Sequence, residues 1–177
     1  MLESKTGVLY ISYDESNHGR FPEICVSVFS HNPADVLKYS SPTSKKHSLK
    51  DNFLPLLISR DYNILLLNQS EKNKINEKEL LGRILASLTY SKLQYSHSEL
   101  NFFIDGQWQK LKLDYARDII REITSMNKNK IKLKCGKDFD KLYPLVNLAD
   151  QIAYWHFKNS TPETLSSNIH LVSLLTE

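Results

Sequence analysis

The amino-acid sequence predicts an α/β fold in which helices pack on a mixed β-sheet of five strands. Three strand-like segments come first in the chain, and helical and strand-like segments alternate after them, in the order β-β-β-α-β-α-β-α. Consecutive strands favour antiparallel pairing, whereas strands joined through helices favour parallel pairing, so this order is typical of a mixed sheet. The chain has 177 residues, of which 41% are hydrophobic. That length suits one hydrophobic core, and we expect a single domain over residues 1–177.

The first three strands are expected at residues 7–13, 23–30 and 62–68, where β-branched, aromatic and aliphatic residues concentrate. The stretch DESNHGRFP between the first two is rich in turn formers, which predicts an antiparallel hairpin. A polar insertion at about residues 32–59 separates the second strand from the third. It contains SSPTSKKHSLK, and we expect little regular structure in it beyond a short helical piece near residues 34–37.

Apolar residues recur at helical spacing in three later segments, which predicts helices at residues 76–94, 111–126 and 143–157. Between them, ELNFFID at residues 99–105 and KIKLKC at residues 130–135 have strand character. Lysine alternates with isoleucine or leucine in KIKLKC, as in an edge strand with one face in solvent. The capping sequence STPE predicts a short helical tail at about residues 160–177.

Composition argues against several classes of protein. No apolar run approaches the roughly 18 residues of a membrane span, and the N-terminal stretch lacks the apolar core of a signal peptide. Cys25 and Cys135 stand far apart and outside any CxxC pattern, so free thiols are favoured over a zinc site or a disulfide. We therefore expect a cytoplasmic protein without a membrane segment. The formal net charge of +3 permits nucleic-acid binding without requiring it.

Acidic residues close two of the expected strands and lie within the last long helix. Asp14 and Glu15 end the strand-like YISYDES, and Asp105 ends NFFID directly before a glycine. Asp150 lies at the edge of the apolar face of LVNLADQIAYWHF, where a buried face meets something polar. Carboxylate oxygens are the ligands that Mg²⁺ and Mn²⁺ prefer. Convergence of Asp14, Asp105 and Asp150 would make a metal site, whereas ordinary solvated acids are the alternative.

The element order and these acids resemble the ribonuclease H-like superfamily. More narrowly, YISYDES and NLADQIAY resemble a prokaryotic family, domain of unknown function 3800. That family opens with a strand leading to Asp-Glu-Ser-Gly and closes with Gln-Leu-Ala-Asp-x-Ile-Ala. The matching residues are Asp14, Glu15, Ser16, Leu148, Ala149, Asp150, Ile152 and Ala153. Asn17 stands in place of the glycine and Asn147 in place of the glutamine. The resemblance spans about residues 9–157 and implies a ribonuclease H-like fold.

The resemblance also implies a nuclease that hydrolyses phosphodiester bonds with two Mg²⁺ or Mn²⁺ ions about 4 Å apart. It implies catalytic and metal-binding roles for Asp14, Asp105 and Asp150. Type II ribonucleases H use an Asp-Glu pair, which implies the same roles for Glu15. Successive strand side chains point to opposite faces, so an exposed turn acid is the alternative for Glu15. Two other functions stay open: a non-catalytic module that binds nucleic acid or protein, and a toxin or defence component that acts on RNA.

Two lysine-rich stretches could bind a nucleic-acid backbone. SKKHSLK contains Lys45 and Lys46, and KNKIKLKCGK contains Lys130, Lys132 and Lys134. Lysines neutralise phosphates without reading sequence, which makes RNA or DNA the expected partner. Solvated loops and protection of a sheet edge are the alternative.

Three further residues have weaker candidate roles. His18 follows the acidic pair and could shuttle a proton, Glu79 could be another metal ligand, and Trp108 could stack on a base. The alternatives are an exposed histidine, a helix N-terminal acid favoured by the dipole, and a packed aromatic ring.

Overall fold

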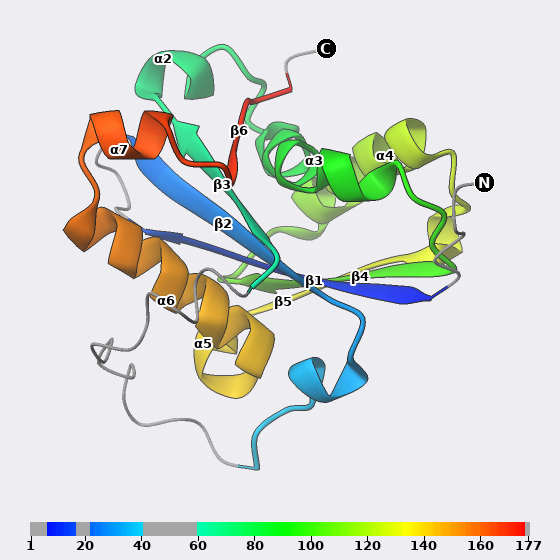
Figure 1. Cartoon of the computed structure of the whole chain (residues 1–177). Helices are drawn as coiled ribbons and strands as arrows, with labels where there is room; N and C mark the ends of the chain where they lie inside the picture. Colours follow the sequence, from blue (N-terminus) through cyan, green and yellow to red (C-terminus); the bar gives the residue numbers. More distant parts are fainter. Residues whose placement is uncertain (1–6, 17–21, 41–59, 176–177) are drawn as a thin grey trace.

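Six strands form one mixed β-sheet in the part of the chain that the structure describes, which is residues 7–16, 22–40 and 60–175 of a computed structural model (Figure 1). The strand order is β5-β4-β1-β2-β3-β6. The strands are β1 (Val8–Ser16), β2 (Glu23–Ser30), β3 (Tyr62–Leu67), β4 (Glu99–Asp105), β5 (Ile131–Gly136) and β6 (Leu171–Val172). β1 pairs antiparallel with β2, and β2 with β3, whereas the β1–β4, β4–β5 and β3–β6 pairs are parallel. The predicted mixed sheet and its first hairpin are therefore confirmed.

The prediction of five strands is wrong, because the C-terminal segment adds β6. The expected helix after STPE is present as α7 (Pro162–Ser166), but the chain then turns back to the sheet instead of continuing as a helical tail. Leu171 pairs with Ile64 of β3, and the Ile64 N–H donates to the His170 carbonyl over 2.8 Å. β6 therefore covers the edge of β3. Its two residues are too few to produce an alternating pattern in the sequence.

Helices cover both faces of the sheet (Figure 1). α3 (Leu80–Leu93) and α4 (Lys110–Thr124) lie side by side on one face, and α5 (Phe139–Leu142) and α6 (Pro144–Asn159) lie on the other. Shorter pieces are α2 (Gln69–Lys72) and two 3-10 turns, η1 (Pro33–Val36) and η2 (Lys128–Lys130). η1 agrees with the helical piece expected near residues 34–37. α2 and α5 were not predicted, since four residues are too few to show a helical period.

Each face of the sheet has its own hydrophobic core. Leu9, Ile11 and Tyr13 of β1 belong to the core beneath α3 and α4. Val26 and Val28 of β2 belong to the core beneath α6. Side chains along a strand alternate between the faces, so residues on β1 are assigned to a face by parity. Asp14, between Tyr13 and Glu15, is thereby directed towards α6.

Two boundaries differ from the prediction in ways that affect the site. β1 runs to Ser16 rather than ending at residue 13, and Glu15 pairs with Cys25 of β2, so both acids of the DES motif lie in a paired strand. α3 begins at Leu80, because residues 76–79 form a turn in which the Asn76 carbonyl accepts the Glu79 N–H. Most of the insertion (residues 41–59) lies outside the described residues. None of the described helices is long and apolar enough to cross a membrane.

Candidate metal centre

Asp14 and Asp105 lie at the same end of the sheet, close to the carboxyl ends of the neighbouring strands β1 and β4. β1 and β4 run parallel, and Tyr13 pairs with Ile104, so each aspartate follows that pair by one residue. Neighbouring strands are about 4.8 Å apart, which places the two backbone positions side by side. The sequence implied this meeting only through the order of elements. Parallel pairing of the two strands is the structural reason for it.

Asp14 is buried among other acids. Its side chain has a relative exposure of 6%, and Asp150 of α6 has one of 9%. Burial raises the pKa of Asp14 well above its usual value, and the charges of Asp150, then Asp105, and more weakly Asp140 raise it further. A hydrogen bond from the Glu15 N–H to Asp14 Oδ1, over 2.7 Å, acts in the opposite direction. Asp14 therefore lies at the centre of four aspartates that repel one another electrostatically.

Asp140 was missed by the sequence analysis. It lies in α5, is 9% exposed, and its backbone N–H donates to Asp105 Oδ1 over 3.2 Å. β5 pairs parallel with β4, so the chain that leaves β5 passes the carboxyl end of β4, where Asp105 lies. The available signal was the acid in DFDKLYP, between the edge strand and the helix that carries Asp150.

Glu15 leaves β1 on the opposite side from Asp14, as strand alternation requires. The Tyr13 hydroxyl donates to Glu15 Oε2 over 2.6 Å, and Tyr13 itself is 1% exposed in the α3–α4 core. Glu15 nevertheless reaches the same pocket as Asp14 and Asp105. A pocket of about 340 Å³ at this end of the sheet is lined by Tyr13, Asp14, Glu15 and Asp105. A ligand that enters the pocket can therefore contact carboxylates from both sides of β1.

The other wall of this pocket follows Asp105. Gly106 has a φ of +93°, a left-handed conformation that favours glycine, and it turns the chain sharply out of β4. Trp108 Nε1 donates to the Asp105 carbonyl over 3.0 Å, and the ring packs against the α3–α4 core. Lys112 lines the pocket and donates to Glu77 over 2.6 Å. The packed alternative for Trp108 thus agrees with the structure, although the residue also borders the site.

The donor set is chemically suited to a hard divalent cation, because it consists of carboxylates that repel one another when no cation is present. Among the described residues, no group of three or more His, Cys, Asp or Glu side chains is arranged to hold a metal ion. The metal-binding roles of Asp14, Glu15, Asp105 and Asp150 therefore remain predictions.

Glu79, the other candidate metal ligand, lies outside this cluster. Glu79 immediately precedes α3 and pairs with Arg83 over 3.5 Å, which agrees with the helix N-terminal alternative. His18, Lys45 and Lys46 lie outside the described residues.

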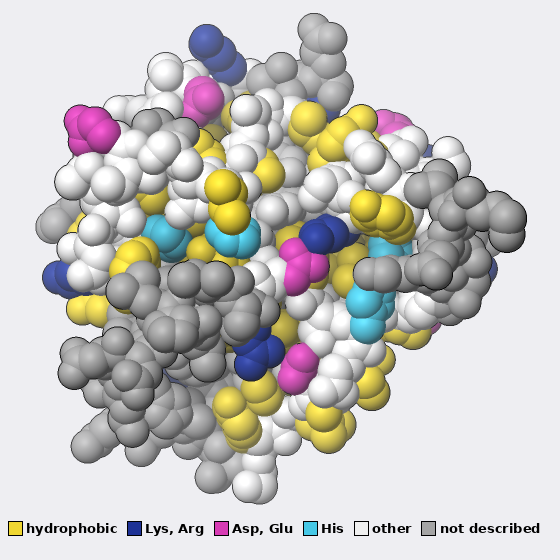
Figure 2. Space-filling view, in the orientation of Figure 1, with side chains coloured by type: hydrophobic (Ala, Val, Ile, Leu, Met, Phe, Trp, Pro, Cys, Tyr) yellow, Lys and Arg dark blue, Asp and Glu magenta, His cyan; other side chains and the backbone are white. Residues whose placement is uncertain are grey.

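The lysines of the predicted edge strand lie at the edge of the sheet. β5 is the first strand in the sheet order, and Lys130 ends the turn η2 just before it. Lys132 pairs with Glu99 over 2.6 Å, and Lys134 Nζ lies 5.2 Å from the centre of the Phe103 ring. Lys132 and Lys134 also line a shallow groove of about 640 Å³. On the described part of the face in Figure 2, Lys and Arg side chains stand apart among apolar and acidic ones.

Solved structures of ribonucleases H have a similar fold. A point mutant of Bst-RNase HIII aligns over 91% of this chain with 12% identity and a TM-score of 0.53, and Bst-RNase HIII in complex with Mn²⁺ aligns over 91% with 12% identity and a TM-score of 0.52. RNase HII of Archaeoglobus fulgidus, solved in complex with PCNA, aligns over 93% with 12% identity and a TM-score of 0.51. The alignments span 54% of each Bst-RNase HIII chain and 84% of the archaeal chain.

These likenesses define the class of fold. The chain has an α/β fold that is structurally similar to ribonucleases H, with a mixed six-stranded sheet and helices on both faces. No protein-family model and no curated protein matches the chain. At 12% identity the comparison shows the fold alone. The narrower resemblance to domain of unknown function 3800 therefore still rests on the two short motifs.

Proposed function

We propose that the protein is a divalent-metal-dependent nuclease that hydrolyses phosphodiester bonds in RNA or DNA. The observation that carries this proposal is the burial of Asp14 beside Asp105, Asp140 and Asp150, whose charges raise its pKa. Such a cluster opposes folding, because like charges are brought together away from water. A bound divalent cation would offset this repulsion, because its positive charge attracts the carboxylates. Bst-RNase HIII, which shares the fold, has been solved with Mn²⁺.

Asp14, Asp105 and Asp150, with Glu15 from the pocket side, would hold Mg²⁺ or Mn²⁺, and Asp140 joins them as a fifth carboxylate. The bound ions would supply the positive charge that activates water and neutralises the leaving oxygen. The chain's own contribution is orientation. The Asp140 N–H holds one oxygen of Asp105, and the Tyr13 hydroxyl holds one oxygen of Glu15.

The lysines of the β5 edge, Lys130, Lys132 and Lys134, would bind the phosphate backbone. Lys132 must exchange its partner Glu99 for a phosphate to do so, and both contacts are ionic. Such binding weakens as salt rises, because the lysines displace counterions from the nucleic acid. Cleavage assays decide between RNA, DNA, hybrid and branched substrates, because fold does not determine the substrate.

A non-catalytic nucleic-acid-binding module is the second candidate. The observation that favours it is that no ready-made coordination shell is present among the described residues. Both candidates bind nucleic acid, but only the nuclease cuts it.

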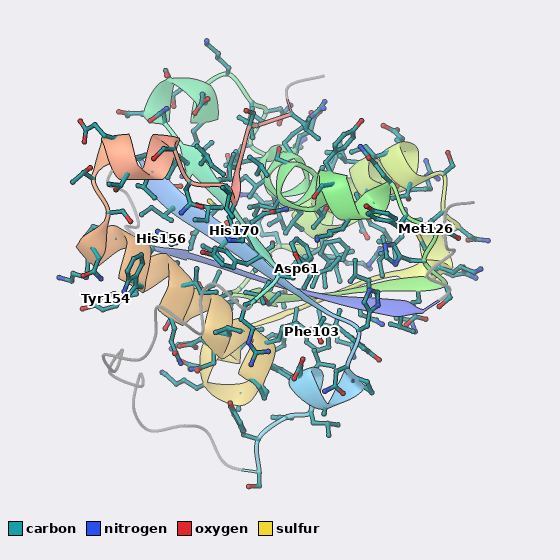
Figure 3. The ribbon with its side chains drawn as sticks, in the orientation of Figure 1. Asp61, Phe103, Met126, Tyr154, His156 and His170 are labelled. Carbon is teal, nitrogen blue, oxygen red and sulfur yellow. The ribbon has the colours of Figure 1, made fainter. Side chains whose placement is uncertain are left out.

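Two measurements test the nuclease. Millimolar Mn²⁺ should raise the melting temperature of the full chain, because the ion binds the folded form. The protein with Mn²⁺ should cleave at least one of single-stranded RNA, RNA–DNA hybrid, duplex DNA and branched DNA. Asp150→Asn should abolish cleavage and most of the thermal shift. Asp61→Asn is the matched control, since Asp61 is 57% exposed and precedes β3 at the opposite end of the sheet (Figure 3).

The outcomes separate the candidates. If no substrate is cut and Mn²⁺ leaves the melting curve unchanged, the nuclease proposal fails. If the protein binds nucleic acid without cutting it, the binding module becomes the better account. Equal cleavage by Asp150→Asn and wild type would remove Asp150 from the site.

A further inference from the structure

Lys141 lies at the border of the acidic cluster. It follows Asp140 in α5, and its Nζ lies 2.5 Å from Asp138 Oδ1. Both side chains of this pair are 44% exposed, so the ammonium group is accessible from solvent. The bond and charge of Asp138 raise the pKa of Lys141, and the charges of Asp140 and Asp105 add to this effect. The ammonium group therefore interacts electrostatically with two acids of the site, while its direct partner Asp138 stands outside the site.

The backbone around Lys141 is held at the carboxyl ends of β4 and β5. The Asp140 N–H is bonded to Asp105 Oδ1, and the Lys141 N–H donates to the Asp138 carbonyl over 2.9 Å. The Phe139 ring packs directly on Gly136 at the end of β5, where a Cβ atom would lie only 2.2 Å from a ring atom. α5 thus cannot shift far from Asp105. The long, half-exposed side chain of Lys141 can still change its direction by rotation about its own bonds.

A phosphodiester that enters this site brings negative charge to a cluster of acids. Bound cations offset part of the repulsion, and a lysine at the border that can change direction offsets more of it where the phosphate arrives. Lys112 lines the pocket, but it is tied to Glu77 over 2.6 Å, and Glu77 does not belong to the cluster. Lys141 is the better placed of these two lysines, because its backbone is joined to the Asp105 carboxylate through Asp140.

We propose that Lys141 is a catalytic residue of the nuclease reaction, and that its ammonium group leaves Asp138 to contact a non-bridging oxygen of the scissile phosphate. This proposal rests on the proposed function. In the hydrolysis, the water oxygen forms a bond to phosphorus and the P–O3′ bond breaks. The products are a 5′-phosphate and a 3′-hydroxyl, and the net proton transfer is from water to the 3′ oxygen. Lys141 keeps its protons and only stabilises the charge on the phosphate.

The test compares Lys141→Met and Lys141→Arg with wild type, on the substrate that wild type cuts and with Mn²⁺ present. Loss of one group that stabilises developing charge lowers turnover by about 100-fold, so we expect that loss for Lys141→Met. Lys141→Arg keeps the charge and should retain most of the rate. The Mn²⁺-induced rise in melting temperature should be the same in all three proteins, because Lys141 does not bind the cation.

Lys158→Met is the matched control. Lys158 lies eight residues after Asp150 in α6, about 12 Å along the helix, and its Nζ lies over the exposed ring of Tyr154. This variant should cut at the wild-type rate. If Lys141→Met also cuts at the wild-type rate, Lys141 is not catalytic and the nuclease proposal stands. If Lys141→Met loses the Mn²⁺ shift together with activity, its role is structural and the proposal is overturned. If wild type cuts nothing, both proposals fail.

Discussion

The Tyr13 hydroxyl donates a 2.6 Å hydrogen bond to Glu15 Oε2, two residues further along β1. The two side chains share one face of the strand because their positions have the same parity. Burial, followed by the charges of Cys25 and Glu15, raises the pKa of Tyr13 well above its usual value, so the phenol stays protonated as a donor. A buried, rigid ring therefore orients the Glu15 carboxylate, which reaches the pocket from the α3–α4 side.

Tyr13→Phe should weaken the response to Mn²⁺ without disturbing the core. The phenyl ring fills the same space. The loss of the hydrogen bond to the charged Glu15, together with the longer 3.7 Å contact with Cys25 Sγ, should lower the free energy of unfolding by about 1–3 kcal/mol. Without that bond Glu15 is held less firmly, so the Mn²⁺-induced thermal shift and the cleavage rate should both fall. Thermal melts with and without Mn²⁺ measure this. Tyr154→Phe, at an exposed tyrosine of α6, should change neither quantity. An undiminished Mn²⁺ shift in Tyr13→Phe would contradict the orienting role.

Asp14→Asn should stabilise the metal-free protein at neutral pH, although most substitutions of buried polar residues destabilise. The folded-state pKa of Asp14 is raised, so its ionisation opposes folding. This penalty is absent at low pH, where Asp14 is protonated in both states, and it grows as pH rises above the unfolded pKa of about 3.9. Each kcal/mol recovered should raise the melting temperature by about 2–4 °C. Melting curves from pH 4 to pH 8 should diverge with rising pH, and a lower melting point for Asp14→Asn at pH 7 would refute the argument.

The larger part of the fold could be predicted from the sequence because long elements carry their pattern within themselves. Each long element has one buried face, and the spacing of its apolar residues along the segment reports that face. This spacing is visible in α3, α4 and α6, and as β-branched runs in β1 and β2. The position of Asp14 and Asp105 at the same end of neighbouring strands also followed from element order, because parallel strands finish at the same end of a sheet.

The missed features are short and depend on contacts that are distant in sequence. β6 has two residues and exists because it pairs with β3. α5 has four residues and is positioned by the contact of its Asp140 N–H with Asp105, 35 positions earlier in the chain. Neither segment has a period of its own, so the local pattern could not identify Asp140 as a site residue. The bond between Tyr13 and Glu15 was missed for another reason, since parity alone does not specify a hydrogen bond.

His156 should make the protein less stable as pH falls below about 6.5. It is 3% exposed, and its ring lies 6.3 Å from the Tyr62 ring, against which His170 stacks (Figure 3). Burial, followed by the nearby charge of His170, lowers the pKa of His156 to about 4. Between pH 6.5 and 4 the unfolded chain binds a proton that the folded chain does not, so stability is present above this window and is lost within it. The loss is at most about 3.4 kcal/mol, from a pKa difference of about 2.5 units at about 1.36 kcal/mol each.

Urea unfolding at pH 7 and pH 4.5 measures this effect. His156→Leu cannot titrate, so its stability should fall less between the two pH values than that of wild type. Asp14 acts in the opposite direction over the same range, which makes the comparison of variants more informative than the wild-type curve alone. An equal loss in both proteins would show that His156 does not titrate in this window.

Asp138→Asn should lower the KM for nucleic acid if Lys141 must leave Asp138 to meet a phosphate. Asp138 has a left-handed backbone with φ of 63°, which asparagine also tolerates, so the turn before α5 should persist. The lost ion pair is half exposed and contributes little to stability.

Removal of an acid near the site also reduces general repulsion of the phosphate, so the single variant does not isolate the effect on Lys141. The double variant Asp138→Asn/Lys141→Met does, because the KM gain that works through Lys141 should vanish in it. An equal KM change with and without Lys141 would assign the effect to general repulsion, and a rise in KM for Asp138→Asn would mean that Asp138 holds Lys141 in its active position.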